Sequence, residues 1–166
     1  MALLDILIYP DQRLHKKAKP VKKVDDRIKK LINDMCETMY EAPGIGLAAP
    51  QVNVLQRIIV VDISESKDSL IAMVNPEVIS SSGLAEHEEG CLSVPGVYAQ
   101  VNRCENIRVR AQDQHGELFE MDADGLLGIC IQHEIDHLDG KVFVDYLSHL
   151  KQDRIRKKMQ KTLRHS

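Results

Sequence analysis

The stretch Gln132-His133-Glu134-Ile135-Asp136-His137-Leu138 decides the fold of this chain, because it predicts a helix built around a metal ion. On a helix, His133 and His137 lie about 6 Å apart along the axis and on one face, so both imidazoles can converge on one divalent ion. Glu134 is rotated off that line, and its carboxylate can reach a water molecule instead of the metal. The pattern is typical of metal-assisted hydrolysis, and a chance cluster on a solvated helix is the alternative.

The helix that carries this motif has a predictable start and end. Asp122 or Asp124 can cap its first turn, and Gly140 is placed to end it. Apolar residues occupy much of its circumference, so we expect most of the helix to be buried. These residues are Leu126, Leu127, Cys130, Ile131, Ile135 and Leu138.

The remaining elements predict an α+β fold with a mainly antiparallel sheet. Apolar spacing indicates a helix that Asp25 or Asp26 caps and that ends near Glu41, before Pro43 and Gly44. Short strands are predicted at 57–62, 70–74, 78–87, 98–103, 107–112 and 117–121, with a turn at 115–116. A last helix covers about 148–163. Short strands around a central metal-binding helix, followed by a C-terminal helix, are expected to form one catalytic domain over 1–166.

Composition excludes several classes of protein. With 166 residues, 43% apolar and 28% charged, the chain is typical of a globular domain. No apolar run is long enough to span a membrane, and the first residues do not resemble a secretory signal. The four cysteines form no CxxC pair, so we expect reduced thiols in the cytoplasm.

The net charge of −3 conceals an uneven distribution, with a basic early chain, an acidic middle and a basic tail. The cations of the tail are Lys151, Arg154, Arg156, Lys157, Lys158, Lys161 and Arg164. Such a tail is more often a solvated helix face than a contact with nucleic acid. We expect no stable binding to DNA.

The third metal ligand must lie upstream of the helix. A catalytic site usually takes three protein ligands and keeps one position for water. In one common class of metalloprotease a third histidine follows the motif, but that position holds Phe143. In another, a later helix supplies a glutamate, and no glutamate follows Glu134.

Cys91 is the favoured third ligand. It lies in Glu89-Gly90-Cys91-Leu92-Ser93, where small residues and turn-formers let the backbone approach a ligand. His87 and His115 are weaker candidates. Cys130 is about 10 Å along the helix axis from His137, so it is expected to line a pocket or the core.

The loop Gly44-Ile45-Gly46-Leu47-Ala48-Ala49-Pro50-Gln51 is the other unusual segment. It matches a dinucleotide-binding pattern, but a helix precedes it and Pro50 interrupts the helix that should follow. Its small residues instead favour a strip of accessible backbone beside a ligand, where Gln51 could present an amide. A plain connecting loop is the alternative.

Three segments together, 44–51, 89–93 and 132–138, resemble those of peptide deformylases of the type found in Gram-negative bacteria and organelles. The likeness covers nearly the whole chain, including Ile6 to Leu14 and Asp124 to Leu127. It implies a metal-dependent hydrolase that removes the formyl group from N-terminal formyl-methionine of nascent peptides and releases formate. It also implies ferrous iron, which zinc, nickel or cobalt can replace, and a cytoplasmic location in bacteria, although the sequence leaves an organellar origin open.

The resemblance assigns roles to single residues. Cys91, His133 and His137 would bind the metal, Glu134 would be the general base and acid, and Gln51 and the backbone N–H of Leu92 would stabilise the oxyanion. Tyr98 stands where other members often have arginine. Substrate binding would involve Gly44, Ile45, Gly46, Glu89, Gly90, Leu126, Leu127 and Cys130.

The resemblance also suggests partners. The substrates would be N-formyl-methionyl peptides, and the basic last helix could contact ribosomal RNA. Two other hypotheses for the function stay open. One is an aminopeptidase or endopeptidase that uses the same helix, and the other is a non-catalytic metal-binding interaction module. The module is disfavoured because structural metal sites have four protein ligands and no fourth is evident.

Overall fold

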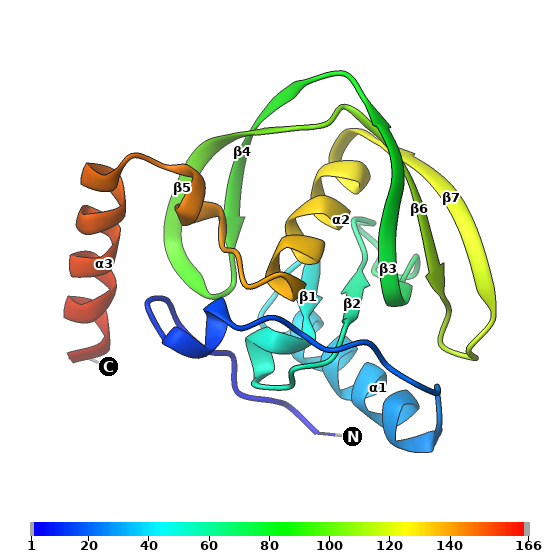
Figure 1. Ribbon diagram of the computed structural model, residues 1–166. Coiled ribbons are helices and arrows are strands. Elements are labelled where there is room, and N and C mark those ends of the chain that lie inside the picture. The colour runs from blue at the N-terminus through cyan, green and yellow to red at the C-terminus, as the bar shows by residue number, and fades with distance from the viewer. Residues whose placement is uncertain (1, 165–166) are drawn as a thin grey trace.

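Two antiparallel sheets with a helix between them form the frame of the molecule, shown as a computed structural model in Figure 1. The structure describes residues 2–164. The larger sheet has five strands in the order β1 (Gly46–Ala48), β2 (Ile58–Val61), β3 (Ile71–Ser82), β6 (Asn106–Gln112) and β7 (Leu118–Asp124). The smaller sheet is a hairpin of β4 (Ala85–Cys91) and β5 (Val94–Arg103).

The helices are α1 (Asp26–Glu41), α2 (Gly125–Leu138) and α3 (His149–Arg164), with single 3-10 turns η1 (Gln12–His15), η2 (Ala49–Val52) and η3 (Phe143–Tyr146). The first two helices lie on opposite faces of the larger sheet. The predicted start of α1 is confirmed, because the Asp25 carboxylate accepts the Ile28 N–H at 3.1 Å. Asp124 occupies the N-cap position of α2 but makes no side-chain cap bond.

Strand β2 explains why the core has two halves. All four of its residues are fully buried. Alternate side chains face opposite sides of the sheet, and a helix covers each side. Ile58 and Val60 pack with the apolar face of α1, whereas Ile59 and Val61 pack with that of α2. The layers are therefore α1, the five-stranded sheet, α2 and the β4–β5 hairpin.

Helix α2 lies at the centre of this arrangement, as its sequence predicts (Figure 1). Ile131 and Leu138 are fully buried against the sheet, and His133 and Glu134, also buried, belong to the same helix. The helix ends where predicted, with Gly140 at φ +78° just beyond it. The α+β class and the central buried helix are confirmed.

Several strand boundaries differ from those predicted: β1 was not expected, β5 begins at Val94 instead of Tyr98, and β3 is longer. The sequence predicts a break between 74 and 78, but β3 continues to Ser82 through irregular pairing around Asn75 and Pro76. The Asn75 side chain compensates by bonding both the N–H and the C=O of Val21. The real break is at Gly83, whose φ of +74° turns the chain into β4. Residues 85–91 therefore form one strand of their own.

Helix α3 covers the predicted 148–163 within a residue and stands at one end of the molecule (Figure 1). Met159 is its buried anchor, packed with Tyr9, Val97 and Phe143, and most of its other described residues are exposed. Among residues 2–164, no helix combines the length and apolar character needed to cross a membrane.

Candidate metal centre

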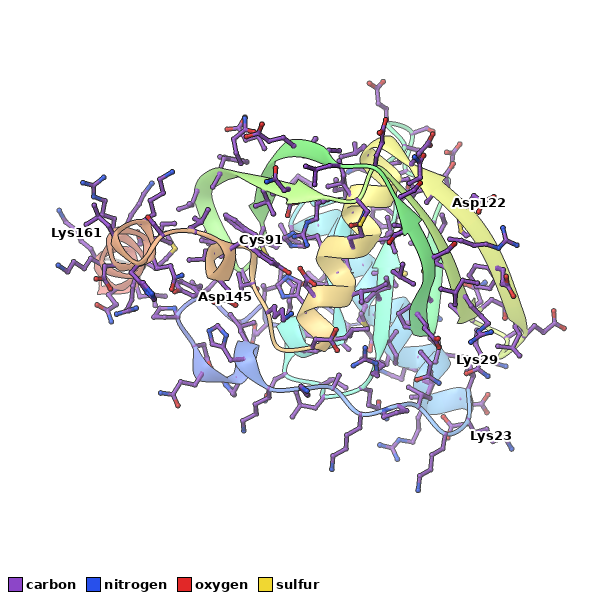
Figure 2. All side chains as sticks on the ribbon, turned by 45° about the horizontal axis from the view of Figure 1, so that its top comes forward. Lys23, Lys29, Cys91, Asp122, Asp145 and Lys161 are labelled. Carbon is purple, nitrogen blue, oxygen red and sulfur yellow. The ribbon has the colours of Figure 1, made fainter. Side chains whose placement is uncertain are left out.

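The β4–β5 hairpin and α2 together bring three metal-binding side chains to one point. Cys91 ends β4, and Figure 2 shows it beside α2 in the middle of the molecule. Its Sγ lies 3.4 Å from Nε2 of His137, which lies 3.2 Å from Nε2 of His133. All three ligand atoms fall within 4.8 Å of one another. Of the predicted ligands, His87 and His115 do not join this cluster.

The three donor atoms suit a transition-metal ion. With metal–nitrogen bonds of 2.0–2.1 Å at a tetrahedral angle, two ligating nitrogens lie about 3.3 Å apart, and a sulfur lies slightly farther away. The observed separations of 3.2 and 3.4 Å match that requirement. One thiolate with two imidazoles suits Fe²⁺ or Zn²⁺ better than Mg²⁺ or Ca²⁺, which prefer oxygen.

Glu134 faces the cluster without belonging to it. Its carboxylate is buried, and Oε1 makes no hydrogen bond to any residue from 2 to 164. Oε2 lies close to the backbone of β1, 2.5 Å from where a Cβ on Gly46 would stand. A buried carboxylate oxygen without a partner is costly unless a ligand or water completes its hydrogen bonding.

The Gln51 amide is held in place by η2 and by the hairpin. Its Oε1 accepts the Ala48 N–H at 2.9 Å, so its NH₂ group must point the other way. That group donates to Ser93 Oγ at 3.1 Å and approaches Cys91 Sγ at 3.5 Å. Of the segment 44–51, predicted to be accessible backbone, residues 47–50 are buried away from the cleft that leads to the cluster, whereas 44–46 and Gln51 line it. Gln51 thus supplies an amide donor beside the sulfur. Leu92 directly follows Cys91, and both line this cleft.

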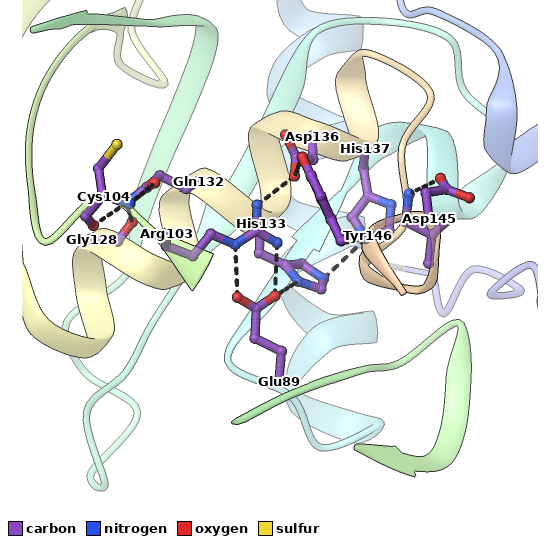
Figure 3. A network of polar contacts seen from close by, with 11 residues as sticks. Glu89, Arg103, Cys104, Gly128, Gln132, His133, Asp136, His137, Asp145 and Tyr146 are labelled. Carbon is purple, nitrogen blue, oxygen red and sulfur yellow. Dashed lines mark hydrogen bonds and ion pairs between the residues drawn. The ribbon is translucent and has the colours of Figure 1, made fainter. Parts of the chain in front are cut away.

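A buried chain of charges fixes the orientation of His133 (Figure 3). Glu89 Oε1 lies 2.8 Å from His133 Nδ1, and the same carboxylate binds Arg103 through two bonds of 2.7 and 2.8 Å. Arg103 also contacts Asp136, whose carboxylate accepts the Tyr146 hydroxyl at 2.7 Å. A metal-ligating histidine commonly bonds a carboxylate through its other ring nitrogen, so this contact leaves Nε2 for a metal. From the sequence, Glu89 was predicted to bind substrate, and Arg103 and Tyr146 were not identified.

The charges around the cluster favour a cation. Burial raises the pKa of Glu134 to about 7. Burial opposes the charge on Glu89, but Arg103 and His133 outweigh it and lower the pKa of Glu89 to about 2. Burial likewise opposes protonation of His133, yet Glu134, Cys91 and Glu89 raise its pKa well above the ordinary value. Burial and His133 lower the pKa of His137. The raised pKa of His133 indicates that the neighbouring carboxylates favour positive charge at this point.

A cleft of about 700 Å³ leads to the cluster. One wall is the segment 44–46 and the other is the hairpin from Gly90 to Tyr98, with His133 and Glu134 at the bottom. Strand β1 forms the edge of its sheet, so one side of its backbone faces away from β2. Predicted substrate-binding residues Gly44, Ile45, Gly46 and Gly90 all line this cleft.

A smaller pocket of about 110 Å³ opens beside the cluster between β4 and α2. Of the predicted residues, Ile45, Glu89, Gly90, Leu126 and Cys130 line it. Leu127 does not, because one residue rotates the helix by about 100° and turns this side chain towards the core under the sheet. Ile129 and His87 line the pocket instead, and neither was predicted there from the sequence. The three-residue step from Leu126 to Ile129 is the signal that could have found Ile129.

The fold and the site together define a metal-dependent hydrolase. A helix presents two histidines and a buried glutamate, a hairpin adds one cysteine sulfur, and a cleft leads to them.

Comparison with known proteins gives the family. The family model for polypeptide deformylase matches residues 3–153. Peptide deformylase 1 of Burkholderia multivorans is 65% identical over 162 residues, covering 97% of this chain and 90% of its own length. The crystal structure of a peptide deformylase from Legionella pneumophila is 53% identical with a TM-score of 0.94, covering 98% of this chain and 96% of that one. A peptide deformylase from Ehrlichia chaffeensis in complex with actinonin is 40% identical with a TM-score of 0.94, covering 98% of both chains. The chain belongs to the polypeptide deformylase family, whose members are metal-dependent enzymes.

Proposed function

We propose that this protein removes the formyl group from N-formyl-methionyl peptides, releasing formate and a free amino terminus. The observation that carries the proposal is the meeting of Cys91, His133 and His137 beside the buried Glu134, at the bottom of a cleft, in a member of this family. The substrates are nascent chains, and we place the reaction in the bacterial cytoplasm because such chains are made there and the relatives are bacterial.

The reaction assigns a task to each side chain. A metal bound by Cys91, His133 and His137 would supply Lewis acidity and lower the pKa of an attacking water. Glu134 takes the proton of that water and later passes it to the leaving amine. Negative charge develops on the formyl oxygen, and the Gln51 amide and the Leu92 N–H donate to it. Each such donor is typically worth about 3 kcal/mol in the transition state.

The cleft positions an extended peptide. Backbone at Gly46 and the hairpin after Cys91 would pair with it as an added strand, because β1 is an edge strand. The methionine side chain would enter the pocket between β4 and α2. Its walls are largely apolar, through Ile45, Leu126, Ile129 and Cys130.

Formate release tests the proposal. The purified, metal-loaded protein should release formate from formyl-Met-Ala-Ser and should leave the unformylated Met-Ala-Ser intact. Cleavage of the second peptide would indicate an aminopeptidase, and stoichiometric metal without either reaction would indicate a non-catalytic module. Actinonin, which is bound in the Ehrlichia chaffeensis structure, should inhibit formate release.

Ferrous iron is the metal we propose for the site, with zinc, nickel or cobalt as substitutes. The Cys91 thiolate favours softer ions and adds negative charge. A thiolate on ferrous iron is open to oxidation, so activity should decay in air. Metal analysis after anaerobic purification should find iron, and reloading with nickel or cobalt should give air-stable activity. Equal activity and equal stability in air for all ions would contradict this assignment.

Helix α3 is proposed as a contact for ribosomal RNA. Its exposed surface carries Lys151, Arg154, Lys157 and Lys161, and the helix is anchored mainly through Met159. Such a basic face is suited to phosphates. Co-sedimentation with ribosomes should weaken with added salt and disappear on deletion of residues after Leu150. Binding that survives both changes would count against this contact.

A further inference from the structure

His87 occupies an unexpected place in the pocket that would receive the first side chain of the peptide. The lining residues from α2 and the 44–46 segment are apolar, apart from His133 of the metal cluster and the neighbouring Glu134, and β4 adds Glu88 and Glu89 beside His87. The imidazole of His87 is a polar group in this wall, and the proposed reaction assigns no task to it.

The strand geometry aims His87 inwards. Along β4, the exposed Glu86 and Glu88 alternate with the more buried His87, Glu89 and Cys91. Successive side chains of a strand point to opposite faces, and pairing with β5 is regular from Ala85 to Glu89, so His87 shares the inner face with Glu89. It lies about 7 Å from Glu89 along the strand, across the pocket from α2.

The ring of His87 has an unfilled hydrogen-bonding position. Its Nδ1 is shielded from solvent and makes no hydrogen bond within residues 2–164. A buried polar atom of this kind normally has a partner, and leaving it without one is costly. A ligand in the pocket is the group that can complete it.

We propose that His87 determines specificity for the first residue by contacting the methionine sulfur. This inference rests on the proposed function and extends it. A thioether sulfur is a weak hydrogen-bond acceptor and also packs favourably against the edge of an aromatic ring. An imidazole with a free nitrogen offers both contacts. A purely apolar wall would bind methionine no better than a hydrocarbon of the same shape.

Norleucine distinguishes a contact with the sulfur from a purely apolar pocket, because it replaces the sulfur with a methylene and keeps nearly the same shape. Wild-type protein should show kcat/KM about two- to tenfold higher for formyl-Met-Ala-Ser than for formyl-norleucyl-Ala-Ser, the range expected for a sulfur–ring contact. His87→Leu should bring this ratio close to one by lowering the rate for methionine. The ratio cancels any effect on the metal or on Glu134, since both substrates undergo the same chemistry.

A conservative variant, a control and a substitute variant complete the design. His87→Gln keeps an N–H donor and should retain part of the preference for methionine. His115→Leu makes the same change at an exposed histidine in the β6–β7 turn and should leave the ratio unchanged. If His87→Leu does not fold, His87→Val suits a strand position and serves the same comparison.

A ratio near one in the wild type, or an equal ratio in wild type and His87→Leu, would overturn the assignment. These outcomes differ from failure of the proposed function, in which the wild type would release formate from neither peptide.

Discussion

Glu134 is the residue on which the proposed chemistry depends most directly. Its side chain lies beside the ligand cluster but outside it, so Glu134→Ala should leave metal binding intact. Turnover should fall by several orders of magnitude, because general acid–base catalysis typically contributes about 10²–10⁴-fold. Formate release and metal content, measured on the same sample, check this. A variant that keeps substantial activity would remove Glu134 from the role of base.

Gly46 has no side chain because the Glu134 carboxylate needs that space. A Cβ at residue 46 would lie 2.5 Å from Oε2 of Glu134 and 2.9 Å from Sγ of Cys130. Gly46→Ala should therefore displace the carboxylate and lower kcat about a hundredfold, the scale expected for a misplacement of about 1 Å. Metal content should not change.

Gly44→Ala is the matched control for that substitution. Its Cβ would meet the end of the Leu92 side chain at 2.7 Å, which can move aside. A smaller loss of activity is expected there. If both variants lost activity equally, the contact between Gly46 and Glu134 would not be the cause.

At the residue scale, the sequence predicted the cluster better than the pocket. Cys91, His133 and His137 stand out because few residue types bind metals and because helix spacing places two of them. Pocket walls are made of ordinary apolar residues, and their positions depend on the rotation of α2 against the hairpin. Leu127 was therefore predicted to line the pocket in place of Ile129, and His87 was not expected there.

Helix α2 depends on a glycine at each end, and the two sites differ in their surroundings. At Gly140, φ is +78° and a Cβ would lie 2.5 Å from the backbone oxygen of His15. At Gly125, φ is +54° and nothing lies within 4 Å. A left-handed conformation costs about 1–2 kcal/mol for a residue with a Cβ.

Gly140→Ala should therefore lower the free energy of unfolding by about 3 kcal/mol, from backbone strain together with overpacking. Gly125→Ala should lower it by only about 1–2 kcal/mol. Thermal unfolding at one fixed metal concentration gives the comparison. Equal shifts in Tm would show that the contact with His15 relaxes without cost.

At the element scale, helices were easier to predict than strand boundaries. The spacing of apolar residues and the caps placed α1 and α2 within a residue or two. Strand β3 passes through Asn75 and Pro76, which usually end a strand, because the Asn75 side chain bonds the distant Val21. A bond to a residue 54 positions away leaves no mark in the local sequence.

Asp62 links α1 to the connection between β2 and β3, and this link makes stability depend on pH. Burial opposes the charge on Asp62, but bonds from Ser64, Tyr40 and Ser69 outweigh it and hold its pKa below the ordinary 3.8. A carboxyl whose pKa is lowered by folding stabilises the protein fully above pH 3.8. This contribution is lost as the pH falls through the value in the folded protein.

Asp62→Asn should cost about 1.5–3 kcal/mol at pH 7, the usual size for hydrogen bonds to a buried charge. The difference in Tm between wild type and variant should shrink below pH 4, because only the wild type loses these bonds on protonation. Protons compete for the metal ligands equally in wild type and variant, so this effect cancels in the difference in Tm. Glu65→Gln, at an exposed residue of the same loop, should give no such convergence.

At the scale of the whole molecule, the layered arrangement follows from patterns that the sequence displays. The run Ile58-Ile59-Val60-Val61 is apolar on both faces, which places its strand between two layers, and α2 is apolar over most of its surface. The separate hairpin was not predicted, since the division of seven strands between two sheets depends on long-range pairing. The basic α3 was predicted as a helix, and its role on the ribosome stays a proposal.

The bonds among Glu89, Arg103, Asp136 and Tyr146 hold the hairpin against α2 through protein groups alone. No metal ion takes part in these bonds, so the packing of the hairpin against α2 should survive removal of the ion. One ion could then be exchanged for another during the lifetime of the protein without the chain having to unfold.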